Sequence, residues 1–262
     1  MICVIIFKME IKNCKVIKNE KIAEKHFILK FENKFSKEFL PGQFLMVYLP
    51  YFYLRRPFSV FKVNKNTISI LYKVVGKGTE ILSKMKKGNI LNILGPCGNE
   101  FNIEQKYENI WIIGGGTGIA PLIFLSEKLK RKNKKITFFY GARSKNLLFF
   151  DILPTGIGYV FSTNDGSYGH KGTIFSIVKN IIKKDEKPDV IYCGGPELLL
   201  QKISSLSTNE KIPSFITLEN FFGCGMGVCY GCVIKVKEQN GWEYKRVCKD
   251  GPIFRGDEVI WQ

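Results

Sequence analysis

Four of the eight cysteines in this 262-residue chain lie close together near its C-terminus. Cys224, Cys229 and Cys232 follow the spacing C-x4-C-x2-C, which is the plant-type spacing of [2Fe-2S] ligands, and Cys248 comes after fifteen more residues. Glycines between them allow positive φ angles and backbone N–H groups that point at sulfur; they are Gly223, Gly225, Gly227 and Gly231. The spacing predicts a [2Fe-2S] cluster. A structural zinc site with four thiolates and inert buried cysteines are the alternatives.

A second candidate site is the segment LRRPFSV, residues 54–60, which follows one expected strand and begins another. An arginine can fork onto a pyrophosphate, an aromatic ring can cover a flavin, and a serine can bond the flavin edge. Further on, the turn GKGT opens a helix at Thr79 or Glu80, and a helix N-terminus binds anions. Flavin phosphates are therefore expected between Arg56 and the Gly78–Thr79 turn, although RPFS alone would also fit a polar barrel turn.

The third candidate is the glycine turn in IIGGGTGIAPL, residues 112–122. It joins an apolar strand to a helix expected from about Ala120 to Arg131, and a second strand is expected at 136–140, so the pattern predicts a βαβ unit. The later YCGGPELLL repeats the order strand, glycines, helix and places Cys193 near the carboxyl edge of the sheet. Open α/β sheets bind ligands at that edge, which favours a dinucleotide site.

These segments need three structural parts to position them. Short alternating runs from about Ile11 to Gly98 predict a small antiparallel β-barrel. Alternating strands and helices predict a parallel α/β architecture from about Glu104 to Ser207. The last fifty residues are too rich in Gly and Cys to continue that repeat. We expect an α+β multidomain chain with a FAD-binding barrel at 1–103, an NAD-binding α/β domain at 104–212 and a cluster domain at 213–262.

Composition limits the partners. The formal net charge is +17, but lysines dominate the 40 basic residues and are spread along the chain, whereas nucleic-acid surfaces gather arginine and stacking aromatics. We expect no nucleic-acid binding and read the charge as compositional bias, with attraction to an acidic partner as the alternative. The apolar run at 2–7 is far shorter than the roughly 20 residues that span a bilayer. With no secretory signal visible, a cytoplasmic location without membrane contact is expected, and Met9 is an alternative start.

The order RPFS, GT, GGGTGIAP and CGGP resembles the ferredoxin-NADP reductase superfamily. Together with CGMGVCYGCVIKV and YKRVCKDGPIF it closely resembles the electron-transfer subunits of dihydroorotate dehydrogenase B. The resemblance covers about Glu10 to Trp261. It implies that FAD contacts Arg56, Pro57, Phe58, Ser59, Leu71, Tyr72, Lys73, Gly78 and Thr79. It also implies that NAD lies at Gly114, Gly115, Gly116, Thr117, Gly118 and Cys193, and that Cys224, Cys229, Cys232 and Cys248 are the cluster ligands.

The resemblance further implies an oxidoreductase subunit that passes electrons from the FMN of a partner catalytic subunit through [2Fe-2S] and FAD to NAD, in pyrimidine biosynthesis. A (β/α)8 barrel takes about 250 residues by itself, so dihydroorotate oxidation requires that partner; a heterotetramer of two of each is expected. NAD rather than NADP is expected because FSTNDGS offers Asp165 and no arginine. Only His26 and His170 occur, and no acid–base catalyst is expected.

Two alternatives remain. The chain could serve as the reductase subunit of a hydrogenase, a transhydrogenase or an oxygenase, although those relatives replace YKRVCKDGPIF. A zinc-stabilised basic binding protein is the alternative from another class, and it would be colourless.

Overall fold

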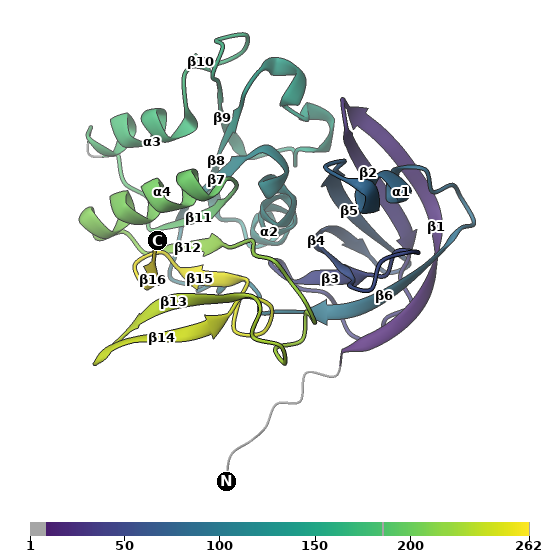
Figure 1. The fold of residues 1–262 in the computed structure, drawn as a ribbon. Helices are drawn as coiled ribbons and strands as arrows, with labels where there is room; N and C mark the ends of the chain where they lie inside the picture. Colours follow the sequence, from purple (N-terminus) through teal and green to yellow (C-terminus); the bar gives the residue numbers. More distant parts are fainter. Residues whose placement is uncertain (1–8, 185, 262) are drawn as a thin grey trace.

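The computed structural model describes residues 9–184 and 186–261, and its N-terminal part is a closed six-stranded barrel (Figure 1). The early apolar run, Cys3 and the question of the start at Met1 lie outside the described residues. Neighbouring strands follow the order β1-β2-β5-β4-β3-β6, and every pairing is antiparallel. The elements are β1 Glu10–Ala23, β2 His26–Glu32, β3 Phe44–Val47, β4 Arg56–Asn64, β5 Thr67–Lys73, α1 Lys77–Ser83 and β6 Ile90–Cys97. The predicted antiparallel barrel is confirmed.

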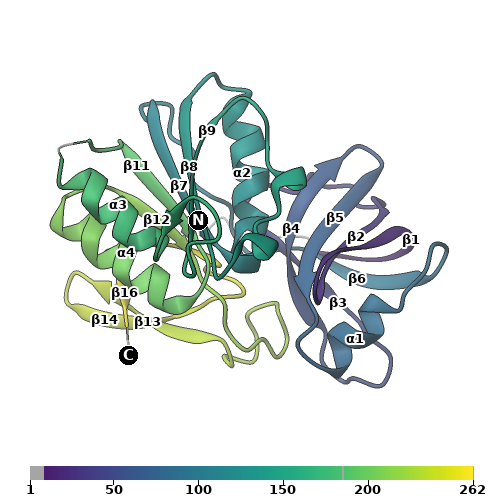
Figure 2. The same ribbon diagram turned by 90° about the horizontal axis from the view of Figure 1, so that it is seen from above.

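A seven-stranded sheet follows, in the order β10-β9-β8-β7-β11-β12-β15. All neighbours are parallel except β12 and β15. The strands are β7 Asn109–Gly115, β8 Lys135–Ala142, β9 Gly158–Thr163, β10 His170–Lys171, β11 Val190–Gly194, β12 Ser214–Thr217 and β15 Ile253–Arg255. The helices are α2 Ala120–Lys130, α3 Ile174–Ile182 and α4 Glu197–Asn209, with 3-10 turns at Gly116–Ile119, Lys145–Leu147 and Phe150–Ile152. Helix α2 lies on the face toward barrel strand β4, and α3 and α4 cover the other face (Figure 2). The parallel α/β part is confirmed.

The last fifty residues do more than the sequence predicts. They contribute β12, which pairs parallel with β11, and β15, which pairs antiparallel with β12, so the sheet extends past the expected end near Ser207. All four residues of β12 are buried, so the strand has no alternation of apolar and polar residues to reveal it. A separate three-stranded sheet, β14-β13-β16, completes the segment with β13 Val233–Glu238, β14 Gly241–Arg246 and β16 Val259–Ile260. The three domain boundaries themselves stay predictions.

One asparagine fastens the C-terminal segment to the barrel. The Asn99 amide nitrogen donates to the carbonyl oxygens of Asp250 and Ile253 at 3.1 and 2.9 Å, and its oxygen accepts from the Ile253 N–H at 3.0 Å. The Asn99 N–H also donates to the carbonyl of Gly251 at 2.6 Å. These bonds hold the residues that directly follow Cys248 against the barrel.

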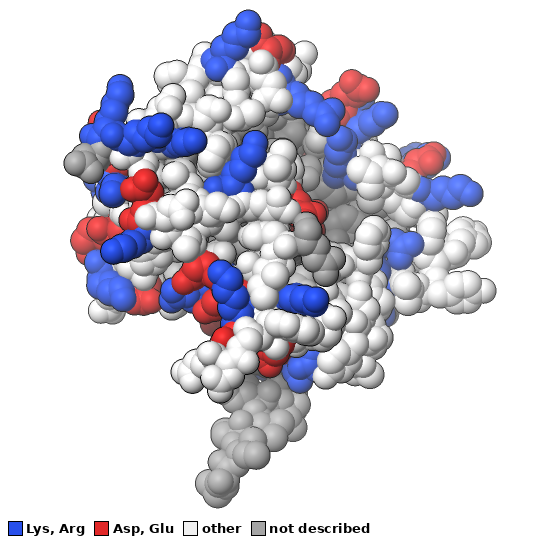
Figure 3. All heavy atoms as spheres, turned by 60° about the vertical axis from the view of Figure 1, so that its left-hand side comes forward, with Lys and Arg blue, Asp and Glu red and all other residues white. Residues whose placement is uncertain are grey.

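Charge is distributed over the surface without a single basic patch on the face drawn in Figure 3, where Asp and Glu lie between the Lys and Arg side chains. Several of these lysines form surface ion pairs, such as Lys187 with Glu210 at 2.9 Å. Among the helices of the described residues, none has the length and apolar character needed to cross a bilayer.

Candidate functional site

Cys224, Cys229 and Cys232 lie in the loop between β12 and β13, Cys248 follows β14, and backbone N–H groups of both parts point at sulfur. Cys232 and Cys248 are buried, Cys224 is half-buried and Cys229 is exposed. Cys224 Sγ accepts from the N–H groups of Met226, Val228 and Cys229 at 3.3 to 3.4 Å. Gly225 and Gly227 adopt φ angles of +71° and +84°, which L side chains rarely adopt, and this conformation lets the loop turn its N–H groups inward.

Backbone N–H groups link the four cysteines in two pairs. The Cys224 N–H donates to Cys229 Sγ and the Cys229 N–H donates back to Cys224 Sγ, both at 3.4 Å. The Cys248 N–H donates to Cys232 Sγ at 3.4 Å, and the Gly227 N–H donates to Cys248 Sγ at 3.2 Å. Within the described ranges no group of three or more His, Cys, Asp or Glu side chains is arranged to hold a single metal ion. Two thiol pairs with donors aimed at them fit a binuclear cluster in which each iron takes two thiolates.

The pKa values of the two pairs differ. Burial opposes ionisation of Cys224, yet the backbone N–H donors outweigh it and lower the pKa of this thiol to about 6. Burial, followed by the neighbouring Cys232 sulfur, raises the pKa of Cys248 to about 12. Because metals bind the thiolate, ligation at Cys248 would release a proton, whereas Cys224 is already prepared to bind.

The predicted flavin-phosphate residues lie close together, where β4 begins and β5 has ended. Arg56 begins β4, and its guanidinium donates to the Leu54 carbonyl at 2.8 Å and lies 4.8 Å from the ring centre of Phe52. A Cβ placed on Gly78 would lie 3.6 Å from Arg56 Nε, so the arginine and the first turn of α1 share one place. The helix begins at Lys77, two residues earlier than predicted. The reason is Thr79, whose hydroxyl accepts from the N–H groups of Val75 and Gly76 at 2.9 and 3.2 Å.

The neighbouring arginine has a different role. Arg55 donates to the carbonyl oxygens of Met46 and Asn92 at 3.4 and 3.1 Å, so it ties β3 to β6. Burial lowers its pKa. Of the two arginines in RRPF, the geometry therefore leaves Arg56 for an anion.

The remaining flavin candidates are spread around β4 and β5. Phe58 and Ser59 are half-buried on β4, and the Phe58 ring lies edge-on to Tyr72 at 6.0 Å. The Tyr72 side chain lies inside the barrel with its hydroxyl on Asn19 at 3.1 Å, and burial raises its pKa to about 12. Pro57 is half-buried, Leu71 is buried and Lys73 is exposed. Tyr72 can therefore reach a flavin only through its backbone.

The two glycine turns of the sheet touch each other. β7 and β11 are neighbours, and the chain leaves β7 on one side toward β8 and β9 and on the other toward β11 and β12, which makes this the topological switch point. A Cβ on Gly118 would lie 2.4 Å from the Gly195 nitrogen, so only glycine permits this approach. On Gly114 it would lie 2.6 Å from Ile119, beneath the turn.

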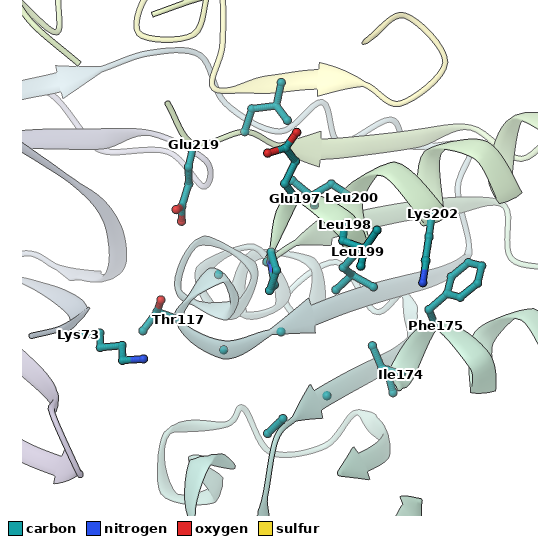
Figure 4. Close-up of a pocket in the computed structure, with 18 of the residues that line it drawn as sticks. Lys73, Thr117, Ile174, Phe175, Glu197, Leu198, Leu199, Leu200, Lys202 and Glu219 are labelled. Atoms are coloured by element: carbon teal, nitrogen blue, oxygen red, sulfur yellow. The ribbon is translucent and has the colours of Figure 1, made fainter. Parts of the chain in front are cut away.

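A cavity of about 1280 Å³ opens at this edge. Gly115, Gly116, Thr117 and Gly118 line it, as does Lys73 from the barrel. In Figure 4 the side chains of Thr117, Lys73 and Glu219 lie around one end of it, and Leu198–Leu200 and Phe175 lie toward the other. The predicted nicotinamide turn is thus joined to a space large enough for a dinucleotide.

Cys193 lies apart from this wall. It is fully buried in the core beneath β11, and burial raises its pKa far above the usual range. Cys193 is therefore not part of the cavity lining, and its contact with NAD stays a prediction. Asp165 lies in an exposed turn, where its carboxylate accepts from the N–H and hydroxyl of Ser167 at 2.9 and 2.7 Å; its neighbour Asn164 is on the cavity wall.

Three residues on the cavity wall escape motif analysis: His26, Arg143 and Glu219. His26 Nδ1–H donates to the Glu24 carbonyl at 2.6 Å, the ring packs on Phe149, and burial lowers the pKa of this histidine. Glu219 is exposed to the cavity, whose walls partly desolvate its carboxyl and raise its pKa. Arg143 directly follows β8, and its position at the carboxyl edge of the sheet is the sequence feature that could have predicted its place on the cavity wall.

Comparisons with known proteins agree with this layout. Residues 219–260 match the model of the iron-sulfur cluster binding domain of dihydroorotate dehydrogenase B, and residues 13–101 match an oxidoreductase FAD-binding domain. The chain is 39% identical over 249 residues to the electron transfer subunit of dihydroorotate dehydrogenase B (NAD(+)) from Caldanaerobacter subterraneus, with 94% of this chain and 97% of that one covered. The same subunit from Clostridium perfringens is 35% identical, with 96% and 98% covered.

Among solved structures, an NADH-dependent reduced ferredoxin-NADP oxidoreductase studied for flavin-based electron bifurcation is 32% identical, with a TM-score of 0.85 over 95% of this chain and 90% of that one. An Amycolatopsis cytochrome P450 reductase, 17% identical with a TM-score of 0.66 over 78% of this chain and 67% of that one, shares the fold.

Proposed function

The chain belongs to the family of dihydroorotate dehydrogenase B electron transfer subunits, and on that premise we propose that it carries electrons from a dihydroorotate-oxidising partner to NAD. The observation that supports this most is the pairing of the four cysteines beside the barrel that bears the flavin motif. Two thiol pairs suit a one-electron carrier. A nicotinamide takes two electrons as hydride, and FAD is the cofactor that interconverts the two modes when bound.

This chain's own residues would bind and orient those groups. Cys224, Cys229, Cys232 and Cys248 would ligate the cluster, and the N–H donors to their sulfurs would tune its potential. Arg56 and the first turn of α1 would hold the FAD phosphates. Pro57, Phe58, Ser59, Leu71, Tyr72 and Lys73 would line the ring and its chain, with Thr79 fixing the turn.

NAD would lie in the cavity at the carboxyl edge of β7 and β11. The Gly114–Gly118 turn precedes α2, so its N–H groups offer the pyrophosphate a helix N-terminus. Asn164 brings the NDG segment to the same wall, which supports an NAD ribose near the Asp165 turn. Because Cys193 is fully buried, we assign it to packing beneath this site.

The partner would be an FMN-containing catalytic subunit, with two copies of each chain in the assembly, working in pyrimidine biosynthesis in the cytoplasm. The supporting surface surrounds the exposed Cys229. Its sequence neighbours Val228 and Tyr230 are largely exposed, and exposed apolar groups of this kind mark docking surfaces. A donor docked on this surface would face the cluster directly.

The proposal is tested by co-purifying the chain with a catalytic subunit from the same organism and adding dihydroorotate and NAD. We expect dihydroorotate-dependent NADH formation by the complex and none by either subunit alone. A complex that oxidises dihydroorotate with an artificial dye but forms no NADH with this chain bound would contradict the proposal.

A second candidate is a reductase subunit of a bifurcating oxidoreductase, because the solved structure at a TM-score of 0.85 is of that class. The same assay separates the two functions. Reduction of NADP that depends on NADH and reduced ferredoxin, in a different complex and without any response to dihydroorotate, would favour this candidate. The zinc-stabilised binding protein is disfavoured because residues 219–260 match an iron-sulfur cluster binding domain.

A further inference from the structure

Strand β3 lies between the flavin motif and the cysteine segment. It pairs with β4 in the register Phe44 with Ser59, Leu45 with Phe58, Met46 with Pro57 and Val47 with Arg56. Every flavin-motif residue of β4 is thus opposite a residue of β3. All four β3 side chains are buried. Neighbouring strands are about 4.8 Å apart, so a group in contact with β3 lies about one strand spacing from the flavin motif on β4.

The two faces of β3 serve different cores. Leu45 and Val47 point into the barrel, whereas Phe44 and Met46 belong to the same core as Cys232 and Cys248. Period-two alternation of a strand produces this division. The outer face of β3 is therefore part of the packing around the cluster ligands.

Direct contacts join this face to the cysteine loop. A Cβ on Gly225, the residue after Cys224, would lie 2.7 to 2.8 Å from Cε, Cγ and Sδ of Met46, so the loop backbone rests on this side chain. Next to it, the ring of Phe44 lies 5.1 Å from the ring of Phe222. Met46 has no exposed surface.

We propose that Met46 is the positioning residue that couples the cluster to the flavin. This inference rests on the proposed function, because it requires both groups to be bound. The Gly225–Met46 contact and the Met46–Pro57 pairing make a dry, close-packed path from the ligand loop to the strand that holds the flavin. One electron leaves one group and enters the other along it, no bond forms or breaks, and Met46 itself is neither oxidised nor reduced.

The contact also explains the glycine at position 225. Its φ of +71° is a conformation that L side chains rarely adopt, and a Cβ there would have to displace the Met46 side chain. Pro57 has no N–H to give to the ladder, and the Met46 carbonyl accepts from Arg55 instead. The backbone of Met46 is thus fixed by a buried arginine while its side chain supports the loop.

The test compares Met46→Ala with Leu91→Ala in the purified chain loaded with both cofactors. Leu91 is equally buried, on β6, and points into the barrel core, so its truncation controls for lost packing. FAD is reduced with NADH in a stopped-flow instrument, and reduction of the cluster is followed by absorbance. We expect Met46→Ala to slow cluster reduction several-fold while NADH still reduces FAD at the wild-type rate, and Leu91→Ala to leave both rates unchanged.

A second readout is independent of turnover. The magnetic interaction between the reduced cluster and a flavin radical, seen as broadening in EPR, should weaken in Met46→Ala and persist in Met46→Leu, which retains the volume. Redox titration checks that both midpoint potentials are retained. Gly225→Ala should reproduce the slow transfer because its Cβ displaces Met46.

The outcomes separate the two claims. A Met46→Ala variant with the wild-type rate of electron transfer and unchanged EPR broadening would overturn the positioning role of Met46 while leaving the proposed function intact. A wild-type chain that binds no cluster or whose FAD is not reduced by NADH would overturn the proposed function. Should Met46→Ala fail to fold, Met46→Val is measured in the same way. We then expect a smaller slowing of cluster reduction, and an unchanged rate would count against the positioning role of Met46.

Discussion

The cysteine segment and the nucleotide cavity are built in opposite ways. The cysteine loop is local, since three candidate ligands and most of the donors to their sulfurs fall within residues 224–232, and only Cys248 comes from further along the chain. The cavity is assembled from distant parts, with walls from the β1–β2 hairpin, the turns after β7 and β11, and the segment after β12. A local site is specified by spacing, whereas an assembled site is specified by the fold.

The difference extends to electrostatics. In the loop, N–H donors lower the pKa of Cys224 to about 6, which prepares it for a cation. On the cavity wall, partial desolvation raises the pKa of Glu219 and burial lowers that of His26, so both shift toward their neutral forms. The loop favours charge on its sulfur, and the cavity disfavours charge on these two groups.

The largest expected effect comes from breaking the local site. Cys229→Ser removes an exposed ligand, so the visible absorption and EPR signal of the cluster should disappear while FAD stays bound. Cys14→Ala, which removes a buried thiol from the barrel, is the control and should retain the cluster. Iron and flavin analysis of both variants decides the matter, and loss of FAD together with iron in Cys229→Ser would mean that the two sites are not separate.

The next largest effect comes from separating the glycine turns of the cavity. Gly118→Ala puts a Cβ 2.4 Å from backbone of Gly195, which cannot move away as a flexible side chain would. We expect a loss of about 1–3 kcal/mol in stability and a greatly weakened response of FAD to NADH. Gly158→Ala in the same sheet meets only ordinary contacts and should be near neutral. Equal NADH kinetics for the two variants would argue against a nucleotide at this edge.

A smaller effect is expected at the flavin phosphate. Arg56→Ala should weaken FAD binding by about tenfold to a hundredfold, because a hydrogen bond to a charged group contributes about 1.5–3 kcal/mol. Arg56→Lys retains the charge but loses the two-pronged guanidinium contact, so its FAD affinity should lie between those of the wild type and Arg56→Ala. The measurement is flavin retained after gel filtration and its dissociation constant; full retention in Arg56→Ala would contradict the assignment.

The smallest effect concerns Glu219. Glu219 is exposed to solvent within the cavity, but the cavity walls partly desolvate its carboxyl and raise its pKa in the folded chain above the ordinary value of 4.5. Between these two values the folded state binds more protons than the unfolded state, so stability falls as pH rises, by an amount that solvent screening keeps small. Glu219→Gln should therefore raise the melting temperature of the cofactor-free chain at pH 7, and the gain should vanish below about pH 4.5. A gain of the same size at both pH values would show that desolvation of the charge is not its cause.

Sequence and structure agree best where the chemistry is local. The C-x4-C-x2-C spacing, the barrel and the turn after β7 were all predictable because each depends on a short segment. Arg56 and the Gly78 turn were predicted to meet, and they do. The contacts between Gly118 and Gly195 and between Gly225 and Met46 were out of reach, because no pattern within a segment reports which backbone another segment approaches.

Two strands and the direction of one side chain escape the sequence, each for its own physical reason. β12 was missed because a strand buried on both faces shows no alternation, and β15 because it is three residues long. Cys193 does lie near the carboxyl end of β11, as its position predicts, but successive side chains of a strand point to opposite faces, and this one is buried in the core. The sequence specifies that a residue reaches the edge, and the pleat decides which way it faces.

The most direct test is an absorbance spectrum of the anaerobically purified chain, with iron, zinc and flavin analysis, before and after addition of NADH. If the chain carries a [2Fe-2S] cluster joined electronically to a flavin, we expect two irons and one FAD per chain, and NADH should bleach the absorbance of both. Zinc in place of iron, with no flavin, would contradict the account and assign the four cysteines a structural role.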